Sequence, residues 1–197
     1  MSRENKKIIV AGVGGQGVVF LTNILVEAAM IDDVPVNVSE IHGLSQRGGV
    51  VTSGIGLGEH VTGFTGNANV DLLIGLEPLE TQRCLLYLHK NSDVVFGNYR
   101  IAPYSVNAEV AAYPDVTILV NYLKEQCREV LFIEQYPDNL MAVHYNIYLL
   151  GRAVQMKNFP FSVDTIEKAI EKTVTNYQLQ KSLHAFRLAK DEGIMTK

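Results

Sequence analysis

Two glycine-rich segments carry most of the residues that could do chemistry in this chain of 197 residues. The first is GVGGQG, from Gly12 to Gly17, and the second is SEIHGLSQRGG, from Ser39 to Gly49. Glycines allow sharp turns and leave backbone N–H groups uncovered, and N–H groups at the amino terminus of a helix stabilise phosphates and carboxylates. Together the two segments predict a surface that meets an anion or another subunit.

The first segment follows a β-branched run and precedes a helical pattern, which is the setting of a dinucleotide-binding turn. Gly12, Gly14 and Gly17 supply the Gly-x-Gly-x-x-Gly spacing, and Gly15 and Gln16 complete the candidate site. The same glycines would also suit close packing of a strand against a helix. Both interpretations stay open at the level of the sequence.

The second segment offers side chains of several kinds. Arg47 could bind a carboxylate or phosphate in a bidentate way, or it could be a structural residue that pairs with Glu40 or caps a helix end. Glu40 could also bind a ribose, although its distance along the chain from the first segment is long for that role. His42 could carry a proton near neutral pH, or it could be a hydrogen-bonded loop residue. The other candidates in this segment are Ser45, Gln46, Gly48 and Gly49.

Four further polar residues lie outside the two glycine-rich segments, and only the first of them has a position that suggests ligand binding. Glu77 follows an apolar run, so it should lie at the carboxyl end of the sheet, where ligands bind in α/β folds. Glu80 and Arg83 are one helical turn apart and are predicted to form a surface pair. His144 is predicted to lie in the core or in an interface.

Three tyrosines fall in a segment with little periodicity, residues 98–115. Tyr99, Tyr104 and Tyr113 could form an exposed aromatic patch that docks a partner, because tyrosine is enriched at interfaces. They could equally pack on this domain as a lid.

The composition excludes several classes of protein. A chain with 47% hydrophobic and 19% charged residues fits one compact domain, which we place at residues 1–197. The net charge of −4 argues against general nucleic-acid binding. No apolar segment reaches the length of a membrane span, and the first residues lack a secretory signal, so we expect a cytoplasmic protein. Cys84 and Cys127 lack the spacing of a metal site, so we expect this chain alone to hold no metal.

The hydrophobic pattern predicts alternating strands and helices followed by a helical tail. Strands are expected at residues 7–13, 34–40, 50–57, 70–76, 93–97 and 129–135, with residues 50–57 pairing antiparallel with residues 60–64. The glycines at 54, 56 and 58 indicate a bulge or the close approach of another backbone. Helices are expected at residues 18–30, from Pro78 to about Leu88, at residues 116–128, and three times after Asp138.

This order of elements predicts the fold class. Alternating units followed by helices form an α/β protein, specifically a three-layer α/β/α Rossmann-like domain. We expect a mostly parallel, mixed sheet with a helical C-terminal tail.

A family resemblance is carried by GVGGQGVVFLTNILVEAA, SEIHGLSQRGGVV, LEPLETQRCLLYL and RIAPYSV, and by the later HYNIYLLGRAV and LHAFRLAKDEG. These segments resemble the beta subunit of indolepyruvate ferredoxin oxidoreductase. The domain of that subunit is similar to the gamma subunit of other 2-oxoacid:ferredoxin oxidoreductases. The resemblance covers most of the chain, and the combination of the two glycine-rich motifs is highly specific.

The resemblance implies a subunit that is inactive alone and that supports the oxidative decarboxylation of an aryl 2-oxoacid with coenzyme A. Thiamine diphosphate and iron–sulfur clusters would belong to a large partner subunit, and electrons would pass to ferredoxin through the complex. The glycine-rich segments would line a shared site or a passage for coenzyme A. A homodimer is possible for the isolated chain. The alternative is a stand-alone Rossmann-like protein that binds a dinucleotide or a small ligand.

Overall fold

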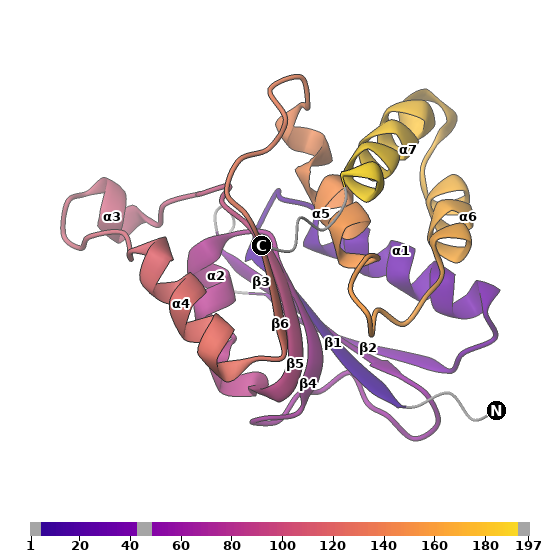
Figure 1. The fold of residues 1–197 in the computed structure, drawn as a ribbon, viewed down its shortest axis with the longest axis horizontal. Helices are drawn as coiled ribbons and strands as arrows, with labels where there is room; N and C mark the ends of the chain where they lie inside the picture. Colours follow the sequence, from indigo (N-terminus) through magenta and orange to yellow (C-terminus); the bar gives the residue numbers. More distant parts are fainter. Residues whose placement is uncertain (1–4, 43–48, 193–197) are drawn as a thin grey trace.

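The computed structural model describes residues 5–42 and 49–192, which alternate between strands and helices (Figure 1). The strands are β1 (Lys6–Val13), β2 (Val36–His42), β3 (Val50–Leu57), β4 (Val70–Gly75), β5 (Leu88–Gly97) and β6 (Glu129–Ile133). The α-helices are α1 (Val18–Ile31), α2 (Pro78–Arg83), α3 (Tyr104–Asn107), α4 (Val116–Gln126), α5 (Tyr145–Ala153), α6 (Val163–Thr173) and α7 (Asn176–Asp191). Short 3-10 turns, η1 (Leu85–Tyr87) and η2 (Ala142–His144), precede β5 and α5.

The strands form one mixed sheet in the order β2-β3-β1-β4-β5-β6. Strand β1 pairs parallel with β4, β4 with β5, and β5 with β6, whereas β3 runs antiparallel to both β1 and β2. The predicted mostly parallel, mixed sheet is therefore confirmed. The strand after α1 does not pair with β1, because β3 lies between them.

The predicted pairing of residues 50–57 with residues 60–64 is wrong, since both edges of β3 are occupied by β1 and β2. The second expectation for this strand, the close approach of another backbone, is confirmed. A Cβ atom at Gly54 would overlap the carbonyl oxygen of Gly63, and one at Gly56 would lie 2.6 Å from that of Thr62. The glycines of β3 thus let residues 61–63 lie directly against the sheet.

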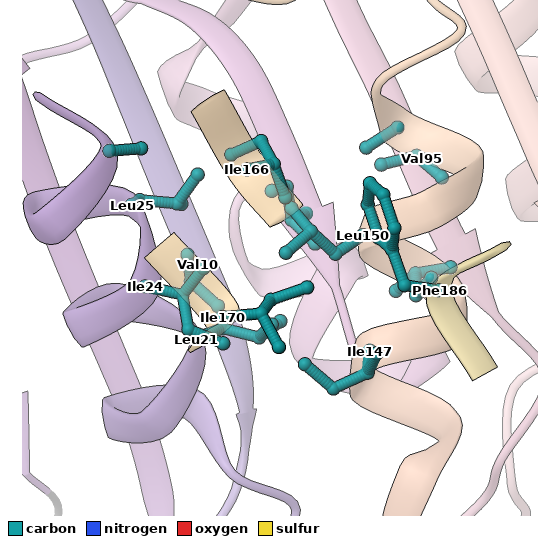
Figure 2. Close-up of a cluster of buried hydrophobic side chains, with 14 of the residues drawn as sticks. Val10, Leu21, Ile24, Leu25, Val95, Ile147, Leu150, Ile166, Ile170 and Phe186 are labelled. Atoms are coloured by element: carbon teal, nitrogen blue, oxygen red, sulfur yellow. The ribbon is translucent and has the colours of Figure 1, made fainter. Parts of the chain in front are cut away.

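Helices cover both faces of the sheet, as the predicted three-layer arrangement requires. The larger core lies between the sheet and α1, α5, α6 and α7, where Val10 of β1 belongs to the same buried cluster as Leu21, Leu150 and Ile170 (Figure 2). The smaller core lies between the other face and helices α2 and α4. The carboxyl ends of the parallel strands are therefore bordered by helices on both sides.

Several element boundaries differ from the predicted ones. The helix that begins at Pro78 ends at Arg83, and Leu88 already belongs to β5. The connection at residues 98–115, which has little hydrophobic periodicity, contains the short helix α3. No helix in the described part of the chain is long and apolar enough to cross a membrane.

Candidate functional site

The two glycine-rich segments meet at one edge of the sheet. Val13, at the end of β1, pairs with Val50 at the start of β3, and the N–H group of Gly14 donates a hydrogen bond to the carbonyl oxygen of Gly49 over 3.0 Å. This edge lies at the carboxyl ends of the parallel strands, where α/β proteins commonly bind ligands. We call the Gly12–Gly17 turn together with Gly49 the glycine edge.

Some of the predicted residues of the second segment cannot be placed at this edge. Ser45, Gln46, Arg47 and Gly48 lie outside the described residues, and so does the side chain of His42, whose backbone ends β2. Glu40 is exposed in β2 and lies opposite Ser53 of β3. Because β3 separates β2 from β1, Glu40 lies two strand spacings, roughly 10 Å, from β1. That separation disfavours the ribose-binding role considered for Glu40.

Gln16 ties the glycine edge to the rest of the sheet. Its Oε1 accepts a hydrogen bond from the N–H of Val13 at 2.8 Å, and its Nε2 donates to the carbonyl oxygens of Leu76 at 3.2 Å and Tyr99 at 3.3 Å. The side chain therefore joins the ends of β1, β4 and β5. Gly12 is needed for this arrangement, because a Cβ atom there would lie 2.9 Å from the Oε1 of Gln16.

Gly17 forms the amino-terminal cap of α1 and packs against the start of α5. Its φ of 87° lies in the left-handed region, and a Cβ atom at this position would overlap the Nδ2 of Asn146. The Nδ2 of Asn146 instead donates to the carbonyl oxygen of Gln16 over 3.2 Å. Since Gly17 has no side chain to cap α1, the positive end of this helix remains available to an anionic group.

A cavity of about 660 Å³ opens beside the glycine edge, within the range typical of small-molecule sites. Its wall includes Gly14–Gly17 of the edge, Phe20 of α1, and Leu76, Tyr99, Ile101 and Tyr136 beyond the strands. The opposite wall comes from Ala142–Asn146, from Thr173–Thr175, and from Gln178 and Ser182 of α7. We call this cavity the tyrosine pocket.

Aromatic rings pack against one another in the wall of the tyrosine pocket. The rings of Tyr136 and Tyr145 stack with centroids 3.8 Å apart, and Tyr99 meets Tyr145 edge to face at 5.2 Å. A Cβ atom at Gly97 would overlap the hydroxyl of Tyr136, so this glycine allows the ring to reach the end of β5. Burial raises the pKa of Tyr136, so its hydroxyl stays protonated at neutral pH.

His144 also lines the tyrosine pocket, although the sequence assigned it to the core or an interface. Its side chain is buried, with the residue 7% exposed, and among the described residues its Nε2 has no hydrogen-bond partner. Burial and the nearby charge of Lys181 lower its pKa, which keeps the imidazole neutral.

Glu77 is fully buried and serves the fold. Its Oε2 accepts from the N–H of Glu80 at 3.0 Å, which caps α2, and its Oε1 accepts from the N–H of Ile101 at 3.4 Å and from the hydroxyl of Tyr113. These bonds hold the two ends of the residue 98–115 connection against the domain.

The three tyrosines of that connection lie in three different settings, and only Tyr113 agrees with the predicted packing on the domain. Tyr113 packs on the domain, Tyr99 lines the tyrosine pocket, and Tyr104 is 85% exposed.

Glu80 and Arg83 form the predicted pair, but the prediction that the pair lies on the surface is wrong for Glu80. The Nε of Arg83 lies 3.4 Å from the Oε1 of Glu80, but only the arginine is exposed, because Glu80 is 5% accessible. Burial is the main cause of the raised pKa of Glu80, and Arg83 opposes it.

The two cysteines are free and weakly reactive. Burial raises the pKa of Cys84 to about 12 and that of Cys127 to about 11. Within residues 5–42 and 49–192, no group of three or more His, Cys, Asp and Glu side chains could hold a metal ion.

Comparison with known sequences identifies one family and several relatives. The pyruvate ferredoxin/flavodoxin oxidoreductase family matches residues 7–192. The chain is 32% identical over 186 residues to indolepyruvate oxidoreductase subunit IorB of Methanothermobacter thermautotrophicus, covering 93% of this chain and 95% of the relative. It is 29% identical over 192 residues to the subunit of that name in Archaeoglobus fulgidus, covering 95% of this chain and 94% of the relative.

Solved structures with the same fold include the gamma subunit of a keto/oxoacid ferredoxin oxidoreductase from Geobacter sulfurreducens. That structure has a TM-score of 0.68 and 18% identity, covering 97% of this chain and 99% of the other. A 2-oxoglutarate:ferredoxin oxidoreductase from Magnetococcus marinus has a TM-score of 0.66 and 15% identity; the match covers 96% of this chain and 31% of the longer one. At these identities the likeness shows the fold.

Proposed function

The chain belongs to the pyruvate ferredoxin/flavodoxin oxidoreductase family, and from that premise we propose that it completes an indolepyruvate-type oxidoreductase as its small subunit. The complex oxidatively decarboxylates an aryl 2-oxoacid, transfers the acyl group to coenzyme A and passes the electrons to ferredoxin. The resemblance indicated by the sequence motifs is thereby confirmed at the level of the family and of the subunit type. The choice of an aryl substrate and of ferredoxin as the acceptor is our proposal.

We assign thiamine diphosphate and the iron–sulfur clusters to a larger partner subunit. An iron–sulfur cluster needs several cysteine thiolates close together, whereas Cys84 and Cys127 are separate and have raised pKa values. The described residues therefore do not fit such a cluster. Coenzyme A would bring the acyl-accepting thiol to the complex.

The observation that carries the proposal is the joining of both glycine-rich segments at one exposed edge. The hydrogen bond from Gly14 to Gly49 and the three bonds of the Gln16 side chain fix this edge on the ends of the parallel strands. Gly14 and Gly15 are exposed, so a second chain can approach the backbone closely. We propose that this edge contacts the large subunit and that Arg47 binds the anionic groups of coenzyme A.

The test is co-expression of the chain with candidate large subunits, purification through a tag on this chain, and measurement of mass and turnover. We expect a stable complex whose turnover requires both subunits. Arg47→Ala should leave the mass of the complex unchanged and raise the KM for coenzyme A about 10-fold, as expected for a lost charged contact of about 1.4 kcal/mol. Lys124→Ala, which removes an exposed charge on α4, is the matched control and should change neither value.

Two results would contradict the proposal. Failure to recover any partner rich in cysteine would remove the assignment to a complex. An unchanged KM for coenzyme A in the Arg47→Ala complex would remove the role proposed for that residue.

The alternative of a stand-alone dinucleotide-binding protein is less well supported. It has the Gly12–Gly17 turn and the amino terminus of α1 in its favour. However, the strand that would supply the ribose ligand is displaced from β1 by β3. Tight binding of a nicotinamide or flavin cofactor to the isolated chain, seen by calorimetry, would restore this alternative.

The remaining expectations about the setting of the protein also stay predictions. They are a cytoplasmic location and a homodimer of the isolated chain. Met141, Val143 and Tyr177 are 56%, 65% and 81% exposed, and they provide apolar surface for either kind of contact. Val143 also lines the tyrosine pocket. Measuring the mass of the chain in solution, with and without the large subunit, tests the self-association.

A further inference from the structure

A smaller cavity lies at the opposite end of the sheet from the glycine edge. Its volume is about 310 Å³, at the low end of the range for small-molecule sites. Its lining includes Lys6 at the start of β1, Leu57 at the end of β3, and Lys157, Asn158, Phe159 and Phe161 between α5 and α6. We call it the lysine pocket. The length of β1, roughly 23 Å, separates it from the glycine edge.

The charged residues that line the lysine pocket are all basic. They are Lys6 and Lys157, and no Asp or Glu is among the described residues of the lining. In the described part of the chain, neither ammonium group has an ion pair or a hydrogen bond, whereas Lys168, Lys172 and Lys190 each pair with a carboxylate. The two positive charges of the pocket are therefore uncompensated, and they favour an anionic ligand.

The rest of the lining is mostly apolar and contains two aromatic rings. Phe161 is buried in the larger core, while Phe159 is half-buried and packs against that core. The two rings meet edge to face, with their centroids 6.2 Å apart. Because Phe159 is only half-buried, part of its surface is accessible to a flat ring of a ligand, and aromatic rings pack favourably against one another.

Asn158 connects the lysine pocket to the neighbouring strands. Its side-chain amide, with the oxygen turned toward Arg128, accepts a hydrogen bond from the Nη1 of Arg128 at 2.6 Å. The Nε of Arg128 also donates to the Oδ1 of Asp93 at 2.9 Å, and Asp93 is buried in β5. These contacts fix the wall between α5 and α6 against β5 and the start of β6. The pocket is therefore preformed, which lowers the entropy cost of binding.

Charge and size together indicate the class of ligand. A phosphate monoester carries close to two negative charges at neutral pH, which matches the two lysines, and lysine binds phosphate as a point charge. A carboxylate would leave one lysine without a counter-charge. A cavity of about 310 Å³ suits one ring with one phosphate rather than a dinucleotide.

We propose that the lysine pocket binds a small aromatic phosphate monoester, such as a nucleoside monophosphate, with the phosphate between Lys6 and Lys157 and the ring against Phe159. This site goes beyond the proposed function and does not depend on it, since none of these residues belongs to the glycine edge.

Isothermal titration calorimetry of the full chain with adenosine 5′-monophosphate (AMP) tests the proposal. We expect saturable binding of one molecule per chain. Adenosine lacks the phosphate and ribose 5-phosphate lacks the aromatic ring, so each should bind at least about 10-fold more weakly than AMP.

Variants test the assigned contacts. Lys157→Gln, at an exposed position, should fold like the wild type and weaken AMP binding about 5-fold, as expected for one lost charged contact. Lys6→Gln should have a similar effect. Lys124→Gln, which removes an exposed charge on α4, is the matched control and should bind like the wild type. Phe159→Leu should weaken the binding of AMP but not that of ribose 5-phosphate, a difference that a purely structural role of the ring would not produce.

Three results would overturn the proposal: no saturable binding, equal binding of AMP and adenosine, or unchanged binding in both Lys6→Gln and Lys157→Gln. Binding that Gly15→Ala weakens and the two lysine variants do not would place AMP at the glycine edge, and it would also overturn the proposal. Assembly with a large subunit is measured separately, so the failure of one proposal leaves the other standing.

Discussion

Replacing Gly17 with alanine tests how the glycine edge is held in place. Gly17 has a φ of 87°, and an added Cβ atom would overlap the Nδ2 of Asn146. Gly15 is the matched control, since it has a similar φ of 96° but meets nothing within 4 Å. Both substitutions cause left-handed strain of about 1–2 kcal/mol, partly offset by a stiffer unfolded chain.

The difference between the two variants isolates the contact with α5. In Gly17→Ala, Asn146 must move and lose its bond to the carbonyl oxygen of Gln16, which costs about 1 kcal/mol. Disturbed packing around the added methyl group adds at least about 1 kcal/mol. We expect Gly17→Ala to be less stable than Gly15→Ala by about 2–3 kcal/mol, or a melting temperature lower by roughly 5–10 °C.

The assay is urea unfolding of the isolated chain, followed by circular dichroism, with an unchanged slope for both variants. A double variant, Gly17→Ala with Asn146→Ala, removes the overlapping amide and should be less destabilised than the sum of the single variants by about 2 kcal/mol. Equal stability of Gly15→Ala and Gly17→Ala, or strict additivity in the double variant, would refute the assignment of this contact.

Three other predictions follow from hydrogen bonds and burial. Gln16→Leu should lower the free energy of unfolding by about 2–3 kcal/mol, because the three hydrogen bonds of the Gln16 side chain are lost. Gln82→Leu, at an exposed site, is the control and should not change it. Equal urea midpoints for the two variants would contradict this prediction. Burial raises the pKa of Glu80, so stability should fall as pH rises through that raised pKa. Glu80→Gln should then be the more stable form at neutral pH and lose this advantage below about pH 4 in urea titrations. Tyr113→Phe should free the residue 98–115 connection from Glu77 and speed its cleavage by protease, and an unchanged cleavage rate would show that this bond does not hold the connection.

The fold class could be predicted because strands and helices differ in hydrophobic period. Val18, Leu21, Leu25 and Ala28 mark one face of α1, and all four are buried. Strand order was harder to predict, because β3 pairs with β1 through residues far apart in the sequence, from Val13 with Val50 to Lys6 with Leu57. Only the tertiary structure shows that β3 is hydrogen-bonded to β1 on one side and to β2 on the other.

The part of the candidate site that lies in one local motif could be predicted, whereas the part brought in from distant segments could not. Glycine spacing identified the Gly12–Gly17 turn, and the register of β1 with β3 brings Gly49 to it. His144 and Asn146 were missed as site residues because more than one hundred residues separate them from the turn. A polar residue beside an apolar helix face has no sequence property that distinguishes a pocket wall from a core.

The position of β3 between β1 and β2 also affects how the chain acquires its structure during synthesis. β1 is made first but lies inside the sheet, and its two neighbours, β3 and β4, end only at Leu57 and Gly75. Until the ribosome has released those segments, the apolar β1 has no strand on either side and α1 has no sheet to cover. Residues 6–75 therefore emerge as a segment that needs shielding from aggregation, and chaperone dependence should be concentrated there.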